Sequence, residues 1–322
     1  MSEAITAKTP WVKNLGDVPA HLEYFQGSMY EAVERIAQQS PNAIAFDFMG
    51  RSTSYKKMME EIQRCAKSLR TIGVREGDCV TIAMPNCPQA IYVFYAANLI
   101  GAIANMVHPL SSEKEIEFYI NESKSVTVVT LDQFYHKVEA IRQNTCAVNI
   151  VIARIRDALS KPLKAGYMLT EGRKLEKIPK DAPVIRWDEF CSLGKACFWN
   201  YKVPRKADDP AVILYSGGTT GKTKGILLTN LNFNALAQQI IATNPMFRPG
   251  DKMLSAMPLF HGFGLGCVFT LCWPTAAAAS WCLGSRRTAM PSSSPNTSAT
   301  SSPACPPCMR RCCACRLWTR QT

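Results

Sequence analysis

The chain has 322 residues, of which 47% are hydrophobic, with 37 Lys and Arg against 25 Asp and Glu, for a formal net charge of +12. This length is enough to bury a large core, and the opening residues MSEAITAKTPWVKNLG contain no apolar stretch of the kind that a secretory signal requires. Eight of the 14 cysteines are spread singly from Cys65 to Cys272, which argues against a disulfide framework and indicates the reducing cytoplasm.

Segments with the spacing of strands and of helices alternate from residue 43 to residue 153. In the helix predicted over 54–71, apolar residues recur every three or four positions. Ser112-x-x-Glu115 matches a capping box, which marks the start of another helix. The predicted strands are 43–48, 79–84, 102–107, 126–130 and 148–153, and the predicted helices are 54–71, 88–100 and 112–121. This alternation predicts an α/β fold with a mostly parallel sheet.

Residues 89–109 are apolar enough to suggest a membrane span. Asn98, Gly101, Asn105 and His108 interrupt the stretch, which fits a helix followed by a strand better than one spanning helix. We therefore expect at most peripheral contact with a membrane.

A basic segment follows the last of these strands. Residues 154–181 hold eight Lys and Arg against four Asp and Glu. A charge run of this kind is usually solvated, and we expect a basic linker over 154–210. Contact of its cations with the phosphates of a cofactor or with anionic lipid is the alternative.

The most informative stretch is 214–225, LYSGGTTGKTKG. An apolar run ending at Leu214 leads into a loop rich in glycine, hydroxyl groups and lysine. Glycines let backbone N–H groups approach an anion closely, while hydroxyl and ammonium groups hold phosphate oxygens. The loop therefore predicts a binding site for a triphosphate.

Two other interpretations of this loop remain open. The Walker A pattern G-x-x-x-x-G-K-[ST] nearly fits 216–223, but Ser216 stands at its first position. A Walker loop also runs directly into a helix, whereas here 225–229 is predicted to be a second strand, with the next helix over 230–241. The other alternative is a Gly- and Thr-rich hairpin without a ligand.

The loop resembles the signature of the adenylate-forming superfamily, which contains acyl-CoA synthetases, peptide-synthetase adenylation domains and luciferases. The family pattern is [YF]-T-S-G-[ST]-T-G-x-P-K-G. The chain matches it at Tyr215, Gly218, Thr219, Thr220, Gly221, Lys224 and Gly225. It departs at Ser216, which keeps a hydroxyl, at Gly217, which loses one, and at Thr223, where proline would fix φ.

A second segment, MPLFHGFGLG over 257–266, resembles the family's P-[LM]-F-H-x-x-G, which borders the acyl pocket. By this resemblance His261 is the candidate catalytic residue that orients the substrate carboxylate, and Phe260, Gly262 and Phe263 line the pocket beside it. A lone histidine is more often structural, but its pairing with the upstream loop favours the functional role. The stretch 73–109 is also similar to the family, so the likeness covers 41–266.

The resemblance implies an ATP-dependent acyl-CoA synthetase. A carboxylate attacks the α-phosphorus of ATP to give acyl-AMP and pyrophosphate, and the thiol of coenzyme A (CoA) then accepts the acyl group. Such a reaction is accelerated mainly by positioning the two substrates and by neutralising the charge of the phosphates. Mg²⁺ would bridge phosphate oxygens beside Thr220. The residues that would bind the nucleotide are Ser216, Gly217, Gly218, Thr219, Thr220, Gly221, Lys224 and Gly225.

The implied partners are small molecules, namely a carboxylate such as a fatty acid, ATP and CoA, and not nucleic acid. Two alternatives are a peptide-synthetase-type adenylation domain and a non-catalytic nucleotide-binding remnant. The isolated start at Met1 favours the synthetase over the peptide-synthetase domain.

The last fifty residues have a different composition. After Lys252 the chain contains no Lys, Asp or Glu, and six cysteines fall between Cys282 and Cys315. Three explanations are a metal site around Cys305-x-x-Cys308, a disordered basic tail that binds nucleic acid, and a coding sequence translated out of frame. Codons that encode residues 304–317 can, when they are read in the neighbouring frame, encode GVPTLYEALLRLPS. That string resembles the family's next segment. We favour this third explanation, with a break between 267 and 277.

The expected fold is thus an incomplete N-terminal domain of an adenylate-forming enzyme, followed by a disordered, non-native tail. The family's Mg²⁺-ligating Glu and its C-terminal domain with the catalytic Lys would follow the break. We therefore expect the chain to be inactive in adenylation and prone to aggregate through its exposed sheet edge. The predicted divisions are a lead segment 1–40, a first α/β subdomain 41–210, the start of an ATP-binding subdomain 211–272, and the tail 273–322.

Overall fold

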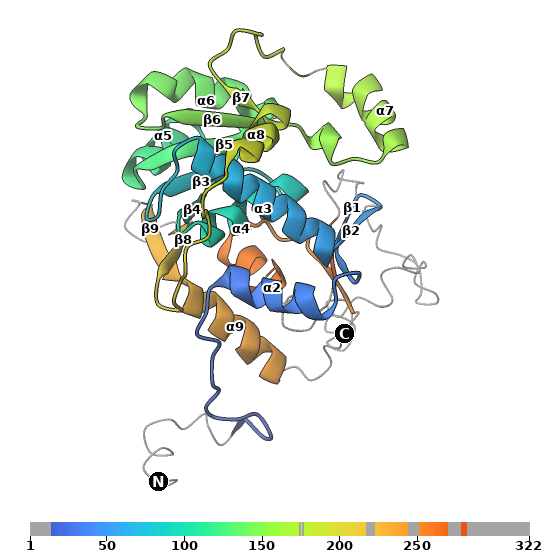
Figure 1. Cartoon of the computed structure of the whole chain (residues 1–322), viewed down its shortest axis with the longest axis vertical. Coiled ribbons are helices and arrows are strands. Elements are labelled where there is room, and N and C mark those ends of the chain that lie inside the picture. Colours follow the sequence, from blue (N-terminus) through green and yellow to red (C-terminus); the bar gives the residue numbers. More distant parts are fainter. Residues whose placement is uncertain are drawn as a thin grey trace, which may run out of the picture.

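A seven-stranded sheet forms the centre of the molecule (Figure 1). The computed structural model describes residues 14–173, 175, 177–216, 223–243, 251–269 and 278–281. All neighbouring strands of this sheet are parallel except the β8–β9 pair, which confirms the predicted α/β class. In spatial order the strands are β7 (Ile185–Arg186), β6 (Asn149–Ala153), β5 (Ser125–Leu131), β3 (Cys79–Ala83), β4 (Ile103–Met106), β8 (Pro210–Ser216) and β9 (Lys224–Thr229).

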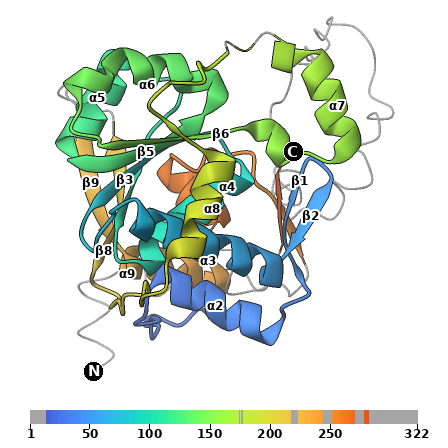
Figure 2. The ribbon, with the colours of Figure 1, turned by 45° about the horizontal axis from the view of Figure 1, so that its top comes forward.

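Helices cover both faces of this sheet (Figure 2). Side chains alternate along a strand, so in β6 Ile150 and Ile152 join the cluster under α5 and α6, while Val151 and Ala153 join the cluster under α3, α4 and α8. The helices are α2 (Met29–Gln39), α3 (Tyr55–Thr71), α4 (Pro88–Leu99), α5 (Glu113–Glu122), α6 (Tyr135–Ile141), α7 (Lys161–Leu169), α8 (Trp187–Leu193) and α9 (Asn230–Thr243).

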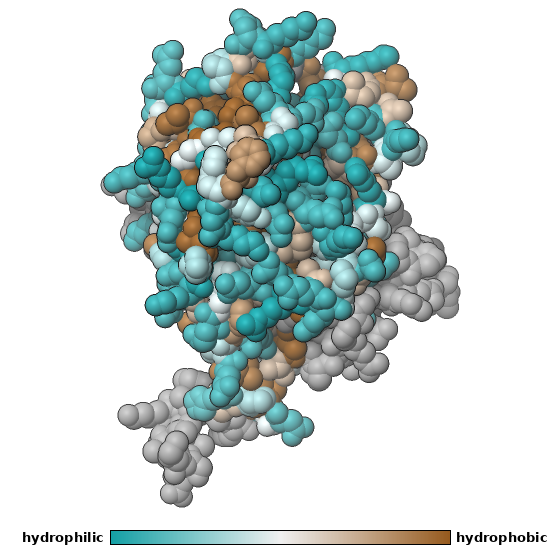
Figure 3. All heavy atoms as spheres, in the orientation of Figure 1, coloured by the Kyte–Doolittle hydropathy of each residue, from teal (hydrophilic) through white to brown (hydrophobic). Residues whose placement is uncertain are grey.

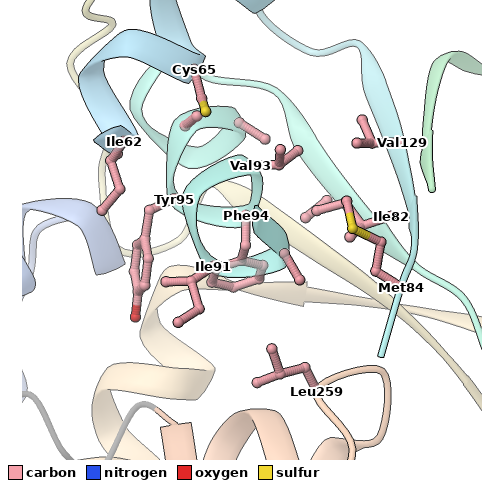
Figure 4. Close-up of a cluster of buried hydrophobic side chains, with 14 of the residues drawn as sticks. Ile62, Cys65, Ile82, Met84, Ile91, Val93, Phe94, Tyr95, Val129 and Leu259 are labelled. Atoms are coloured by element: carbon pink, nitrogen blue, oxygen red, sulfur yellow. The ribbon is translucent and has the colours of Figure 1, made fainter. Parts of the chain in front are cut away.

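The larger hydrophobic core surrounds α4. Eleven of its twelve residues are buried, so the apolar stretch that suggested a membrane span is an interior helix followed by β4. The core extends to several sides of α4, as the side chains of Ile91, Phe94 and Tyr95 show (Figure 4). Leu259, from a loop far away in the sequence, belongs to the same cluster. Of the helices in the described residues, none has the length and hydrophobicity that a membrane crossing requires.

A second, four-stranded sheet has the order β10 (Lys252–Leu254), β11 (Ala278–Trp281), β1 (Ile44–Phe48) and β2 (Arg51–Ser54). β11 pairs in parallel with both β1 and β10. Its four residues belong to the segment predicted to be a disordered tail, and for them that prediction is corrected, because the edge of β1 supplies backbone groups for a strand to pair with. The rest of the predicted tail, residues 273–277 and 282–322 with its cysteines, lies outside the described residues.

Two regions contain more structure than the sequence patterns predicted. The lead segment includes α2, whose Ser28 and Glu31 form a capping box, a signal that was readable in the sequence. The predicted linker 154–210 contains α7, β7 and α8. β7 pairs with β6, and Phe190 of α8 is fully buried, so tertiary contacts order a segment whose charge suggested solvation.

The close packing of a short 3₁₀ helix against α3 requires a glycine at position 194. Gly194 begins the short 3₁₀ helix η6 (Gly194–Ala196), and a Cβ there would lie 2.8 Å from the Arg64 carbonyl oxygen and 2.8 Å from Ser68 Oγ of α3. We expect Gly194→Ala to lower the free energy of unfolding by about 1–3 kcal/mol, measured by urea denaturation. Gly166→Ala in α7 is the matched control, because a Cβ at Gly166 meets nothing within 4 Å and alanine favours a helix. Equal destabilisation by both changes would contradict the packing explanation.

Candidate functional site

The strands that flank the loop predicted to bind phosphate meet at the carboxyl edge of the main sheet. β8 ends at Ser216 and β9 begins at Lys224; these two residues pair across the hairpin, as do Tyr215 and Gly225. α9 starts only after β9, at Asn230. A Walker loop runs directly into a helix, so this order of strand, loop, strand and helix excludes that geometry. The predicted loop residues Gly217, Gly218, Thr219, Thr220 and Gly221 lie outside the described residues.

Gly225 allows the two strands to close tightly beside the loop. A Cβ at this position would lie 3.2 Å from Cε1 of Tyr215 and 3.3 Å from Cγ2 of Ile213. A larger residue would push the Tyr215 ring aside. Ser216, which is half-buried, and Lys224, which is exposed, pair at the end of the hairpin, so a hydroxyl-bearing residue and a lysine flank the loop.

Tyr215 ties the start of the loop to a buried polar cluster. Its ring lies 4.1 Å from that of Tyr119, and its hydroxyl donates to the Tyr119 carbonyl oxygen at 3.1 Å. Asn105 donates to the same oxygen at 3.2 Å, to Ser123 Oγ at 2.9 Å and to Thr81 Oγ1 at 2.8 Å. Burial raises the pKa of the Tyr215 hydroxyl, which keeps it a neutral donor. The loop therefore begins from a fixed residue.

Asn86 holds the second motif in place. It follows β3, and its Nδ2 donates to the carbonyl oxygens of Ser255 at 3.2 Å and Met257 at 2.8 Å, while its Oδ1 accepts from the Leu259 N–H at 2.8 Å. The sequence analysis singled out the stretch 73–109 as similar to the family but assigned no role to this residue. Its position directly after a buried strand, at the edge where parallel strands end, is the signal that could have identified it.

The His261 segment lies beside β8. A Cβ at Gly262 would be 3.7 Å from Cδ1 of Leu214, so the second motif adjoins the strand that carries the loop. The Phe263 N–H donates to His261 Nδ1 at 3.2 Å, which places the proton of a neutral ring on Nε2. His261 and Phe263 are both exposed, and Phe260 is half-buried. The structure thus brings the two predicted motifs to one edge of the sheet.

His108 is a further residue at this edge that the sequence patterns treated only as an interruption. It follows β4, its ring lies 4.3 Å from that of Phe260, and its Nδ1 accepts from the Leu110 N–H at 3.0 Å. Burial and the Lys137 cation lower the pKa of His108, with Glu115 opposing them. The imidazole is therefore neutral at pH 7 and presents an Nε2–H donor next to the proposed acyl pocket.

We expect His108 to titrate below its ordinary pKa of 6.5. Since the unfolded chain then takes up a proton at higher pH than the native chain does, His108 should reduce stability as the pH falls through and below 6.5. The imidazole C2–H signal in an NMR titration, assigned with His108→Asn, reports the midpoint. Lys137→Gln should raise the midpoint toward the ordinary value, whereas the distant Lys195→Gln should leave it unchanged. A midpoint at or above 6.5 in the unaltered chain would contradict the prediction.

The family model described as AMP-binding enzyme matches residues 33–315. The chain belongs to this family. That range includes the β8–β9 hairpin, the His261 segment and most of the Cys- and Arg-rich end of the sequence.

Individual relatives agree with this membership. The chain is 27% identical over 267 residues to a long-chain-fatty-acid–CoA ligase of Bacillus subtilis and 30% identical over 271 residues to one of Salmonella typhimurium. These alignments cover 81% and 80% of this chain but 47% of each relative, so the chain spans about half the length of the relatives it matches.

Solved structures share the fold. An anthranilate CoA ligase in complex with anthranoyl-AMP superposes with a TM-score of 0.68 at 20% identity, over 85% of this chain and 47% of that one. A long-chain-fatty-acid-CoA ligase from Archaeoglobus fulgidus gives a TM-score of 0.64 at 19% identity, over 80% and 48%. At these identities the likeness establishes the architecture, which is the predicted one.

Proposed function

We propose that the chain binds MgATP at the β8–β9 hairpin and represents the nucleotide-binding part of an AMP-forming acid–thiol ligase. The observation that supports this most directly is the hairpin itself: Ser216 and Lys224 pair where β8 ends and β9 begins, on either side of the glycine-rich sequence, near the His261 segment. Ligands of open α/β sheets bind at the carboxyl edge.

Each group has a role in this proposal. Lys224 and the hydroxyls of Ser216 and Thr219 hold the β- and γ-phosphates, and the backbone N–H groups of 217–221 complete the cradle. His261 donates from Nε2 to the carboxylate and so orients it for attack on the α-phosphorus. Phe260 and Phe263 supply apolar walls for the acyl chain. No protein nucleophile is needed, because holding the two substrates together provides much of the rate.

Mg²⁺ is implied by the nucleotide. The hydroxyl and ammonium groups at the hairpin mouth fit phosphate oxygens, and Thr220 is proposed to lie beside the ion. When bound, Mg²⁺ neutralises phosphate charge.

We propose a fatty acid as the carboxylate and CoA as the thiol. The relatives in Bacillus subtilis and Salmonella typhimurium are named long-chain-fatty-acid–CoA ligases, and the exposed Phe263 and half-buried Phe260 are suited to an apolar acyl group. These same names favour an acyl-CoA synthetase over a peptide-synthetase-type domain.

A second candidate is nucleotide binding without turnover. No Lys, Asp or Glu follows Lys252, so the sequence from there on offers neither a carboxylate for Mg²⁺ nor a lysine for catalysis. We propose that the chain of 322 residues holds ATP but does not complete adenylation, as its composition led us to expect.

Calorimetry with the full chain tests nucleotide binding, and ATP–pyrophosphate exchange with fatty acids tests turnover. MgATP should bind more tightly than AMP, because the loop is expected to hold the outer phosphates. Failure of MgATP to bind at millimolar concentration would contradict the proposed site. Exchange of pyrophosphate would reject the non-catalytic candidate while leaving the site assignment intact.

A further inference from the structure

Two cysteines of different exposure meet between helices α3 and α8, which lie side by side (Figure 2). Cys65 of α3 is fully buried, whereas Cys191 of α8 is half-buried and packs against the cluster to which Cys65 belongs. Burial and a hydrogen bond with the Cys191 thiol raise the pKa of the Cys65 thiol. Both residues are free thiols in the structure, so the contact joins two reduced sulfur atoms.

The backbones of these two elements approach as closely as a disulfide requires. Gly194 follows Cys191 by about one helical turn, and a Cβ there would lie 2.8 Å from the Arg64 carbonyl oxygen and 2.8 Å from Ser68 Oγ. Arg64 and Ser68 flank Cys65 on α3. A disulfide needs Cα atoms about 4.4–6.8 Å apart, whereas the axes of packed helices usually lie about 8–10 Å apart. The glycine contact therefore brings the two cysteines within bridging range.

Solvent reaches this pair from one side only. Cys191 lines a groove between α3 and α8 that has a volume of about 710 Å³ and is also bordered by Arg64, Trp187 and Lys195. Hydrophilic side chains predominate on the face of the molecule that carries α3 (Figure 3). A small polar reagent therefore has access to Cys191, whereas Cys65 has no exposed surface and is reached only through Cys191.

We propose that Cys65 and Cys191 form a site of reversible oxidation, at which hydrogen peroxide converts the two thiols to a disulfide. The Cys191 sulfur attacks one peroxide oxygen and the O–O bond breaks. Cys191 becomes a sulfenic acid, and the other oxygen leaves as water with the thiol proton. The Cys65 sulfur then attacks the Cys191 sulfur, and the sulfenic hydroxyl leaves with the Cys65 proton as a second water. The two thiols lose two electrons and two protons, which reduce the peroxide to water.

The difference in burial assigns the order of these reactions. Cys191 meets the peroxide first because only its side chain adjoins the groove. The adjacent Cys65 captures the sulfenic acid before a second peroxide oxidises it further, as a resolving cysteine does. The bond would join α3 to the segment between β7 and β8, and a thiol reductant would break it again by exchange. The inference does not depend on the proposed ATP site, because its readout is the bond itself.

Peptide mapping of the full chain tests the proposal. The reduced protein is treated with hydrogen peroxide, its remaining thiols are alkylated, and it is digested with trypsin. Cleavage at Arg64 and Arg186 gives the peptides 65–67 and 187–195, each with a single cysteine. Mass spectrometry should find these two peptides joined, lighter than their sum by two hydrogen atoms, and dithiothreitol should separate them. A different partner for Cys191, or a sulfinic acid at Cys191 beside an alkylated Cys65, would overturn the proposal.

Two variants separate this pair from the other cysteines. Cys191→Ser should abolish the joined peptides and leave Cys65 reduced, because its route to the peroxide is lost. Cys146→Ser is the matched control, since Cys146 is an exposed thiol outside α3 and α8, and it should give the same joined peptides as the unaltered chain. Peroxide should raise the melting temperature of the unaltered chain and of the control but not that of Cys191→Ser, because a disulfide constrains the unfolded chain. An equal rise in all three proteins would contradict the assignment.

Discussion

Replacing Lys224 with methionine is expected to weaken MgATP binding by at least tenfold. Lys224 begins β9 opposite Ser216, at the mouth of the glycine-rich loop, and its ammonium group is exposed there. A hydrogen bond to a charged group contributes about 1.5–3 kcal/mol, and about 1.4 kcal/mol corresponds to a factor of ten in affinity. Methionine keeps most of the side-chain length but removes the charge, so the loss reports the contact with phosphate.

Lys252→Met is the matched control for this change. Lys252 is also an exposed lysine at the start of a strand, β10, but it belongs to the other sheet. Calorimetry should give the control the dissociation constant of the unaltered chain. Equal constants for the Lys224 and Lys252 variants would show that the hairpin does not hold the phosphates, whatever the chain does with ATP.

Replacing Asn230 with alanine should cause a large loss of stability, about 3–5 kcal/mol in the free energy of unfolding. Asn230 is fully buried at the start of α9. Its Oδ1 accepts from the Met29 N–H at 3.1 Å and from Asn98 Nδ2 at 2.8 Å, and its Nδ2 donates to the Lys206 carbonyl oxygen at 3.1 Å. Alanine would leave the Met29 N–H and the Asn98 amide buried without their partner, and each of these groups carries a desolvation penalty.

Asn232→Ala, on the same helix, separates this network from helix capping. The Asn232 side chain is exposed, and its Oδ1 accepts from the Thr229 N–H at 2.9 Å. Its loss should cost about 1 kcal/mol or less, since water can replace the bond. Urea denaturation monitored by circular dichroism measures both changes. Similar effects of the two substitutions would contradict the role assigned to the buried Asn230.

Local patterns determined most of the main sheet and both motifs. The helix predicted over 54–71 is α3, the capping box at Ser112 starts α5, and the second strand after the loop is β9. These features depend on periodicity and on bonds between residues a few positions apart, which a sequence displays directly. The choice between a Walker loop and a strand–loop–strand hairpin stayed open until the structure showed β9 ahead of α9.

Sequence patterns predicted less in segments whose order depends on contacts with distant parts of the chain. Residues 154–210 looked solvated, yet β7 and α8 are ordered because β6 offers a free edge and α3 an apolar surface. The lead segment contains α2, whose stability depends partly on Asn98 and Asn230, residues far away in the sequence. Propensity cannot report such contacts, since they exist only once the chain has folded.

The sequence by itself determined the family, the position of the glycine-rich loop and the identity of His261 as a candidate, because each depends on residue types at fixed spacing. Only the tertiary structure decided which other groups meet them. Asn86 follows β3, whereas Asn105 belongs to β4 and His108 follows it. Neighbouring parallel strands bring their carboxyl ends to a common edge, however far apart they are along the chain. Hydrogen bonds across that edge require atoms within about 3 Å of each other, a condition that folding creates and that spacing along a chain does not reveal.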